Sequence, residues 1–204
     1  MKKATQSIAA LFSTFILLNS CTIGKNSVST QKDVFDLANE PSSTCFVQLN
    51  DGSIQQYKTL TLVTGVLTTP HLLADGKEVI DAKKIMAYQN DKHYAVSPKI
   101  LTSKKNSLVA VETLPGFAIK RVTGKISIYS RKFYNGANTA DEYFVQNGED
   151  GFIVAYSKDV LKNLLKEDVK ALDYFNNNTK AAKKSAKLLT AVEMYNNKLL
   201  MTKN

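Results

Sequence analysis

The pattern of apolar and polar residues changes at residue 157, and it predicts strands before that point and helices after it. Between residues 45 and 156, short apolar runs alternate with turn signals, of which Asp51-Gly52 and Asp75-Gly76 are the strongest. Such pairs suit the positive φ angles of two-residue hairpin turns. Short strands at regular spacing predict an antiparallel β meander over residues 44–156 that curls into a barrel or a sandwich. Residues 97–107, rich in Ser, Lys and Asn, are expected to form a long loop.

From Ser157 onward the apolar positions recur with the helical period. Ser157 fits the N-cap of a first helix, and Asn176-Asn177-Asn178 ends its pattern. A second helix is expected over residues 179–200, with its apolar stripe formed by Ala181, Leu188, Val192, Tyr195 and Leu199. The flank of this stripe is basic, with Lys180, Lys183, Lys184 and Lys187. The stripe either packs on the β region, which is the commoner fate, or lies on an anionic membrane. The chain therefore predicts an α+β fold, with C-terminal helices over residues 157–204.

The first twenty residues have the organisation of a secretory signal peptide. Lys2 and Lys3 precede an uncharged, largely apolar stretch over residues 8–18. This stretch is too short for a membrane-spanning helix, which needs roughly 20 residues, but it fits the apolar region of a signal peptide. We therefore expect residues 1–20 to direct export.

The end of this segment, Leu18-Asn19-Ser20-Cys21, resembles a bacterial lipobox. The resemblance implies that Cys21 is acylated and becomes the first residue after cleavage. Residues 21–43 would then be the lipidated cysteine and a flexible polar tether. The alternative is an ordinary cleaved signal, in which case a Cys21–Cys45 disulfide becomes possible in an oxidising compartment.

The charge is moderately basic, with 27 Lys and Arg against 18 Asp and Glu. A basic balance favours contact with anionic lipid headgroups or acidic polymers. The chain lacks the combined aromatic and basic recognition pattern of nucleic-acid-binding domains, so no nucleic-acid partner is expected.

Residues able to perform catalysis or to bind a metal are scarce in the sequence. A cysteine nucleophile with a histidine base would have to combine Cys45 with His71 or His93. Cys45, however, falls on the apolar side of an alternating strand and is expected to be a buried hydrophobic residue. The two histidines are 22 residues apart, without the close spacing of zinc ligands. The nine glycines form no phosphate-binding loop. We expect no catalytic residue, no metal site and no cofactor.

Tyrosines interleaved with cations form the best candidate binding surface. The core of this surface is Tyr129, Arg131, Tyr143 and Tyr156, with Lys125, Lys132 and Tyr134 nearby. Tyrosine offers a rigid amphipathic face, and the cations could hold anionic groups. The alternative is that these tyrosines simply suit a pleated sheet.

The lipobox, the Ser/Thr-rich tether, the Asp-Gly hairpins and the helical tail together resemble small uncharacterised outer-membrane lipoproteins of Bacteroidota. The segments that carry this resemblance are residues 85–90 with 93–95, and residues 117–121 with 124–126. It implies a lipoprotein of the cell envelope, in the outer membrane, and assigns no activity. As partners we expect the membrane, through the lipid anchor, and an envelope protein or polymer. The leading hypothesis is a non-enzymatic binding or scaffolding module. The alternatives are an envelope hydrolase with an atypical site, and a protein that docks on a membrane or partner through its C-terminal basic helix.

Overall fold

The computed structural model of this 204-residue chain describes residues 44–65, 67–103, 111–134, 139–177 and 184–201. The predicted signal peptide, the lipidated Cys21 and the tether lie outside these residues. The strands are β1 (Cys45–Leu49), β2 (Ile54–Tyr57), β3 (Leu60–Val63), β4 (His71–Ala74), β5 (Glu78–Ile80), β6 (Ile85–Gln89), β7 (Tyr94–Val96), β8 (Leu101–Thr102), β9 (Ala118–Val122), β10 (Ile126–Tyr134), β11 (Thr139–Asn147) and β12 (Ile153–Ala155). The α-helices are α2 (Lys158–Leu165), α3 (Val169–Asn177) and α4 (Lys184–Met201), and η1 (Ala82–Lys84) and η2 (Pro98–Ile100) are short 3₁₀ helices.

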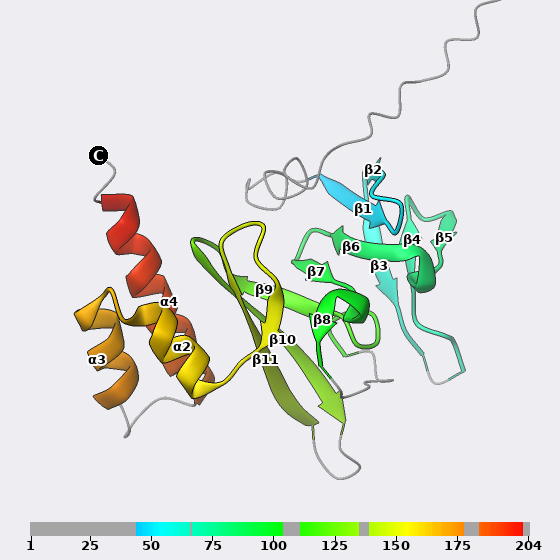
Figure 1. Ribbon diagram of the computed structural model, residues 1–204. Helices are drawn as coiled ribbons and strands as arrows, with labels where there is room; N and C mark the ends of the chain where they lie inside the picture. Colours follow the sequence, from blue (N-terminus) through cyan, green and yellow to red (C-terminus); the bar gives the residue numbers. More distant parts are fainter. Residues whose placement is uncertain (1–43, 66, 104–110, 135–138, 178–183, 202–204) are drawn as a thin grey trace, which may run out of the picture.

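The strands form a large curled sheet and a small one. The large sheet has nine strands in the order β2-β1-β6-β7-β9-β10-β11-β12-β8, and the small sheet is β3-β4-β5. The large sheet curls into a half-barrel, with the small sheet at one end of the molecule and the three α-helices at the other (Figure 1). The predicted α+β fold, a largely antiparallel β region followed by helices, is confirmed.

The hairpin signals in the sequence act as predicted. Asp75 and Gly76 join β4 to β5 and have φ angles of 50° and 68°, the left-handed region that a tight hairpin needs. Gly52, between β1 and β2, has a φ of 87°. The carboxylate of Asp75 also accepts a hydrogen bond from the backbone N–H of Thr59 (2.8 Å), which ties this turn to the start of β3.

Three predictions about the β region need correction. The expected loop over residues 97–107 begins with η2 and β8, because Ser97 caps the short helix through the N–H of Lys99 (3.2 Å). Strand β8 then pairs in parallel with β12, so the sheet is not entirely antiparallel. Strands β10 and β11 are also longer than predicted and pair over nine residues. The outer end of β11, residues 139–142, is mainly polar and partly exposed, and this weakens the hydrophobic alternation that marks a strand.

The single helix expected between residues 157 and 175 is two helices. Asp168 is buried, and its carboxylate accepts from the N–H groups of Lys170 (3.1 Å) and Ala171 (3.4 Å). It therefore begins α3 as an N-cap and ends the α2 segment before it. Ser157 caps α2 through the N–H of Val160 (3.2 Å), as predicted.

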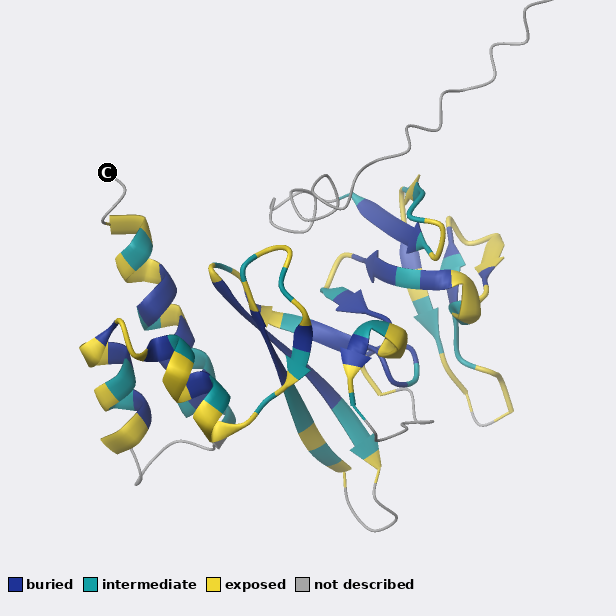
Figure 2. Cartoon of the chain, viewed as in Figure 1, coloured by how far each residue is buried: buried dark blue, intermediate teal, exposed yellow. Residues whose placement is uncertain are grey.

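The helices bury their apolar sides against one end of the large sheet (Figure 2). This helix core contains Val122, Ile126, Ile128 and Val145 of the sheet and Leu161, Leu165, Phe175, Leu188, Val192 and Tyr195 of the helices. The described part of the predicted stripe, Leu188, Val192, Tyr195 and Leu199, therefore packs on the β region, the commoner of its two expected fates, and Ala181, Lys180 and Lys183 lie outside the described residues. Asn196 fastens this contact, because its side-chain amide bonds to both the N–H (3.1 Å) and the carbonyl (2.8 Å) of Ile126.

The small sheet covers the other end of the same face of the large sheet. This small-sheet core contains Leu60, Leu72 and Ile80 of the small sheet with Val47, Tyr88, Ala95, Leu114 and Phe117. A third cluster, formed mainly by Ala87, Val96, Leu101, Tyr129, Phe144 and Ile153, lies on the opposite face. It joins β6 and β7 to β8 and β12, which are far apart in the strand order, so this face is the inside of the curl. We call the two faces the covered face and the inner face.

Candidate functional site

The two layers on the covered face leave a polar strip between them at β9 and β10. One row of paired residues crosses this face and consists of Val47, Tyr88, Ala95, Ile119, Ser130 and Tyr143. Its first three members belong to the small-sheet core, and Tyr143 packs against the helix core. Between them, around Ile119 and Ser130, a small hollow is lined by Val111, Glu112, Thr113, Ile119, Ser130, Arg131 and Lys132. We call the strip formed by Glu112, Arg121, Ser130 and Lys132 the saddle.

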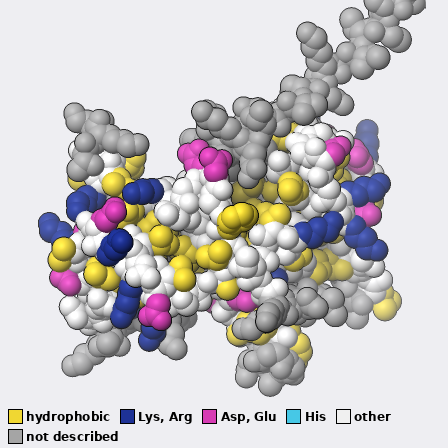
Figure 3. Space-filling model, in the orientation of Figure 1, with side chains coloured by type: hydrophobic (Ala, Val, Ile, Leu, Met, Phe, Trp, Pro, Cys, Tyr) yellow, Lys and Arg dark blue, Asp and Glu magenta, His cyan; other side chains and the backbone are white. Residues whose placement is uncertain are grey.

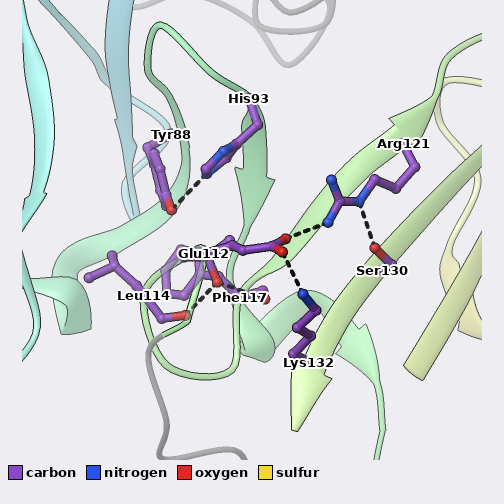
Figure 4. Close-up of polar contacts among 9 residues, drawn as sticks. Tyr88, His93, Glu112, Leu114, Phe117, Arg121, Ser130 and Lys132 are labelled. Atoms are coloured by element: carbon purple, nitrogen blue, oxygen red, sulfur yellow. Dashed lines mark hydrogen bonds and ion pairs between the residues drawn. The ribbon is translucent and has the colours of Figure 1, made fainter. Parts of the chain in front are cut away.

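Two cations converge on one carboxylate in the saddle (Figure 4). Nη2 of Arg121 and Nζ of Lys132 each lie 2.6 Å from a different oxygen of Glu112. The Nε–H of Arg121 also donates to the hydroxyl of Ser130 (2.8 Å). The hydrogen bond from Lys132, supported by Arg121, holds the pKa of Glu112 below its usual range. Each of the three charged side chains is a little over one-third exposed, so solvent reaches the saddle.

The backbone explains why these side chains meet. Between β9 and β10 the register shifts, so that Val122 opposes Ile128 while Lys120 opposes Tyr129, leaving Arg121 as the extra residue of a β-bulge. A bulge re-aims the side chain of its extra residue. Ser130 and Lys132 are two positions apart on β10 and therefore share a face.

Glu112 reaches the saddle from the segment that precedes β9. The hydroxyl of Thr113 lies 2.8 Å from the carbonyl of Leu114 and 3.2 Å from that of Phe117, which closes this segment into a turn. Leu114 and Phe117 are buried in the small-sheet core and anchor the turn beside the sheet. Glu112 is thus presented on a short, locally closed segment rather than on a strand.

His93 and Tyr88 flank the saddle on the small-sheet side (Figure 4). The Tyr88 hydroxyl lies 3.3 Å from Nε2 of His93, and Asn90 fixes the turn by accepting from the His93 N–H (2.9 Å). Burial, followed by the positive charge of Arg121, lowers the pKa of His93. His93 is therefore a neutral group at the edge of the saddle at neutral pH.

This arrangement favours binding of an acidic group over nucleophilic chemistry. The neighbour of the Ser130 hydroxyl is a guanidinium, which stays protonated and cannot act as a general base. Arginine presents a fork of donors that suits carboxylates, and lysine adds a second charge. The Glu112 carboxylate occupies both cations in the structure and shows which ligand chemistry they accept.

The predicted binding surface of Tyr129, Arg131, Tyr143 and Tyr156 is wrong as a single surface. Tyr129 and Arg131 face the inside of the curl and are 3% and 4% exposed. The Tyr129 hydroxyl donates to Gln146 (2.7 Å). Tyr143 and Tyr156 lie against the helix core and are only partly buried. The alternation of apolar and polar residues along β10 assigned each side chain to the correct face of the strand. Both faces of this sheet are packed against other parts of the chain, so the face predicted to be exposed is buried.

Arg131 is an internal structural residue. Its Nε–H donates to Glu142 (2.8 Å), Nη1 donates to the carbonyl of Gly116 (3.0 Å), and Nη2 donates to the hydroxyl of Ser103 (2.9 Å). The side chains of Arg131 and Glu142 are 2% and 12% exposed. This network ties β10 and β11 to two loop segments and leaves the guanidinium unavailable to a ligand on the surface.

The other residues considered in the sequence lie in ordinary structural settings. Cys45 is buried in the small-sheet core, and burial raises the pKa of its thiol, which disfavours a reactive thiolate. Nδ1 of His71 lies 2.9 Å from the carbonyl of Thr69. Lys125 lies 3.7 Å from Glu167 and over the ring of Tyr195. Tyr134 is about half exposed near the end of the β10–β11 hairpin.

Glu112 and Arg121 were missed by the sequence reasoning, which noted Lys132 only as a cation near the tyrosines. No residue spacing marks these side chains as a cluster, since a bulge and a turn bring them together.

Within the described parts of the chain, no three His, Cys, Asp or Glu side chains gather as a metal site would require. Nor is any helix there long and apolar enough to cross a membrane.

Basic and apolar side chains are separated on the face seen in Figure 3. Lys and Arg gather over the helices at one end and over the small sheet at the other, with hydrophobic side chains between them.

Comparisons with protein-family models, with curated proteins and with solved structures found no match to this chain.

Proposed function

We propose that this chain is a lipoprotein of the cell envelope and that its β region is a non-enzymatic binding module. In this proposal Cys21 carries the lipid anchor, and the saddle receives a carboxylate of an acidic segment in a partner protein. The observation that supports binding is the convergence of Arg121 and Lys132 on one carboxylate in a strip that solvent reaches.

The Glu112 carboxylate acts as an internal stand-in for the partner. Because Arg121, Lys132 and Glu112 are all more than one-third exposed, each ion pair contributes about 0–1 kcal/mol after screening. Exchange of Glu112 for an external carboxylate therefore costs little. A multivalent acidic segment would gain further from the net positive charge of the cleaved chain, which is +7 once Lys2 and Lys3 are removed with the signal peptide.

The binding proposal is tested with a hexaglutamate peptide and the full chain, by fluorescence anisotropy at low and high salt. We expect salt-sensitive binding that a double variant, Arg121→Gln with Lys132→Gln, weakens at least tenfold. The matched control is Lys83→Gln with Lys84→Gln, which removes the same charge from exposed positions on η1. No binding by the natural chain, or equal loss in both double variants, would overturn the proposal.

The anchoring proposal is tested separately in a Gram-negative host. Mass spectrometry of the membrane-extracted protein should find an acylated Cys21 at the N-terminus, because two or more acyl chains give stable anchoring. The Cys21→Ser variant should move to the soluble envelope fraction. An unmodified Cys21, or a variant that stays in the membrane fraction, would contradict this part of the proposal.

A further inference from the structure

The imidazole of His93 is connected to the turn that presents Glu112. Nε2 of His93 lies 3.3 Å from the hydroxyl of Tyr88, and the backbone N–H of Leu114 donates to the same hydroxyl. Leu114 belongs to the closed segment that carries Glu112 into the saddle. Because the Leu114 N–H occupies one acceptor position of the Tyr88 oxygen, the hydroxyl proton is available to the neutral imidazole. A change in the charge of His93 therefore acts directly beside the saddle.

Several charged side chains act on His93. They come from β9, from the segment before β9 and from the turn of His93 itself, and they are Arg121, Glu112, Asp91 and Lys92. Lys132 of β10 holds the Glu112 carboxylate from its other side (Figure 4). Burial and the cations disfavour the imidazolium, whereas the two carboxylates favour it, and burial together with Arg121 prevails and lowers the pKa of His93. The imidazole is thus neutral at neutral pH, while Glu112 is held by Arg121 and Lys132.

Protonation of His93 changes the balance of charge around the saddle. At neutral pH the two positive charges of Arg121 and Lys132 face the single negative charge of Glu112. The imidazolium adds a third positive charge, which favours an external carboxylate. It also gives Glu112 a cationic neighbour when an external carboxylate takes its place on the two cations. The Tyr88 hydroxyl can accept as well as donate, so its contact with His93 persists in the charged state.

We propose that protonation of His93 strengthens the binding of an acidic segment at the saddle, so that mild acid increases the affinity. This inference rests on the binding function proposed above and adds a regulator of the same site. His93 acts through its charge and not as a ligand-binding group, because its Nε2 is engaged by Tyr88. Since protonation and binding are linked, the acidic segment must in turn favour the imidazolium.

The first measurement is the affinity of the full chain for a hexa-aspartate peptide, by fluorescence anisotropy at about pH 7.5 and about pH 5.0 and at constant low ionic strength. Aspartate carboxylates, with a pKa of about 3.9, stay mostly ionised over this range, so the probe keeps its charge. We expect the affinity to rise about fivefold at the lower pH, the lower end of typical linkage effects. The rise should disappear in His93→Gln. It should persist in the matched control His71→Gln, which removes the other histidine of the chain, on β4.

The second measurement needs no variant. Proton NMR of the natural chain follows the titration of the His93 imidazole with and without saturating hexa-aspartate. Reciprocal linkage predicts that the peptide raises the pKa of His93 by about 0.7 pH unit, the same fivefold factor. The imidazole signal of His71 is the internal control and should not respond to the peptide.

Three results would overturn this inference: an affinity that does not depend on pH, a rise that survives in His93→Gln, or a His93 titration that the peptide leaves unchanged. If the peptide binds at about pH 7.5 and the double variant Arg121→Gln with Lys132→Gln weakens that binding, the proposed function stands even where the regulation fails. Absence of binding at both pH values would refute the proposed function and this inference with it. The two failures are therefore distinguishable.

Discussion

Replacing Arg131 should destabilise the fold far more than replacing Lys132, the next residue along β10. Within the described residues, the guanidinium of Arg131 makes four polar contacts at 2.8–3.0 Å, two of them to the same oxygen of Glu142, and only 2% of its side chain is exposed. The Arg131→Gln variant leaves the Glu142 carboxylate, itself 12% exposed, without its counter-charge. Breaking a buried pair in this way costs about 3–5 kcal/mol.

Lys132 provides the matched control because its ion pair with Glu112 is more than one-third exposed on both sides. The Lys132→Gln variant should lose about 0–1 kcal/mol, as is usual for surface pairs. Unfolding by urea, followed by circular dichroism, measures both variants under the same conditions. The two variants change neighbouring residues of β10, and each removes one positive charge. The difference between their unfolding free energies therefore reports the burial of the Arg131 ion pair.

The Glu142→Gln variant completes a double-mutant cycle with Arg131→Gln. If the two side chains act as one unit, the double variant should cost less than the sum of the single ones. A loss below about 1 kcal/mol for Arg131→Gln would refute our interpretation of this residue as internal. It would restore Arg131 as a candidate surface residue.

Three further perturbations test the helical layer and the histidine. Asp168→Ala removes the N-cap of α3 and should cost about 0.5–2 kcal/mol in urea unfolding, whereas a cost near zero would deny the capping role. Asn196→Ala leaves the N–H and carbonyl of Ile126 without their partner and should cost about 1–3 kcal/mol; an unchanged midpoint would contradict this. His93 has a lowered pKa in the folded chain, so the unfolded chain takes up its proton first and stability should fall as the pH drops below about 6.5. In His93→Gln this part of the pH dependence should disappear, and an identical profile would exclude His93 as its source.

Local turn and capping chemistry was readable from the sequence because it depends on adjacent residues. The left-handed turn at Asp75-Gly76 and the cap at Ser157 involve at most four consecutive positions. Asp168 caps α3 by the same chemistry, but the apolar periodicity of the sequence continues across this position. The sequence pattern therefore did not reveal that α2 ends and α3 begins there. Apolar periodicity therefore located the helical region correctly and miscounted its helices.

The site could not be predicted because it depends on register. Arg121 reaches the saddle through a bulge, and a bulge moves a side chain by one position without leaving any mark in composition. Arg131 illustrates a related limit. The alternation along β10 placed Arg131 on the face of the strand that does not carry Ile126 and Ile128. In a sheet with one solvent-exposed face, that face would have been the exposed one. In this fold both faces are covered, so a charged residue on the polar side of the pattern is buried and paired.

Covering both faces of the sheet also explains why candidate sites are few and where they fall. The small sheet and the helices each close one end of the covered face, and the strand ends close around the inner face. Polar groups that the fold itself needs, such as Arg131 and Gln146, are satisfied by loops and neighbouring strands. The saddle differs because its charges stay within reach of solvent where the two layers do not meet. This departure from full coverage is therefore the place where binding should be sought.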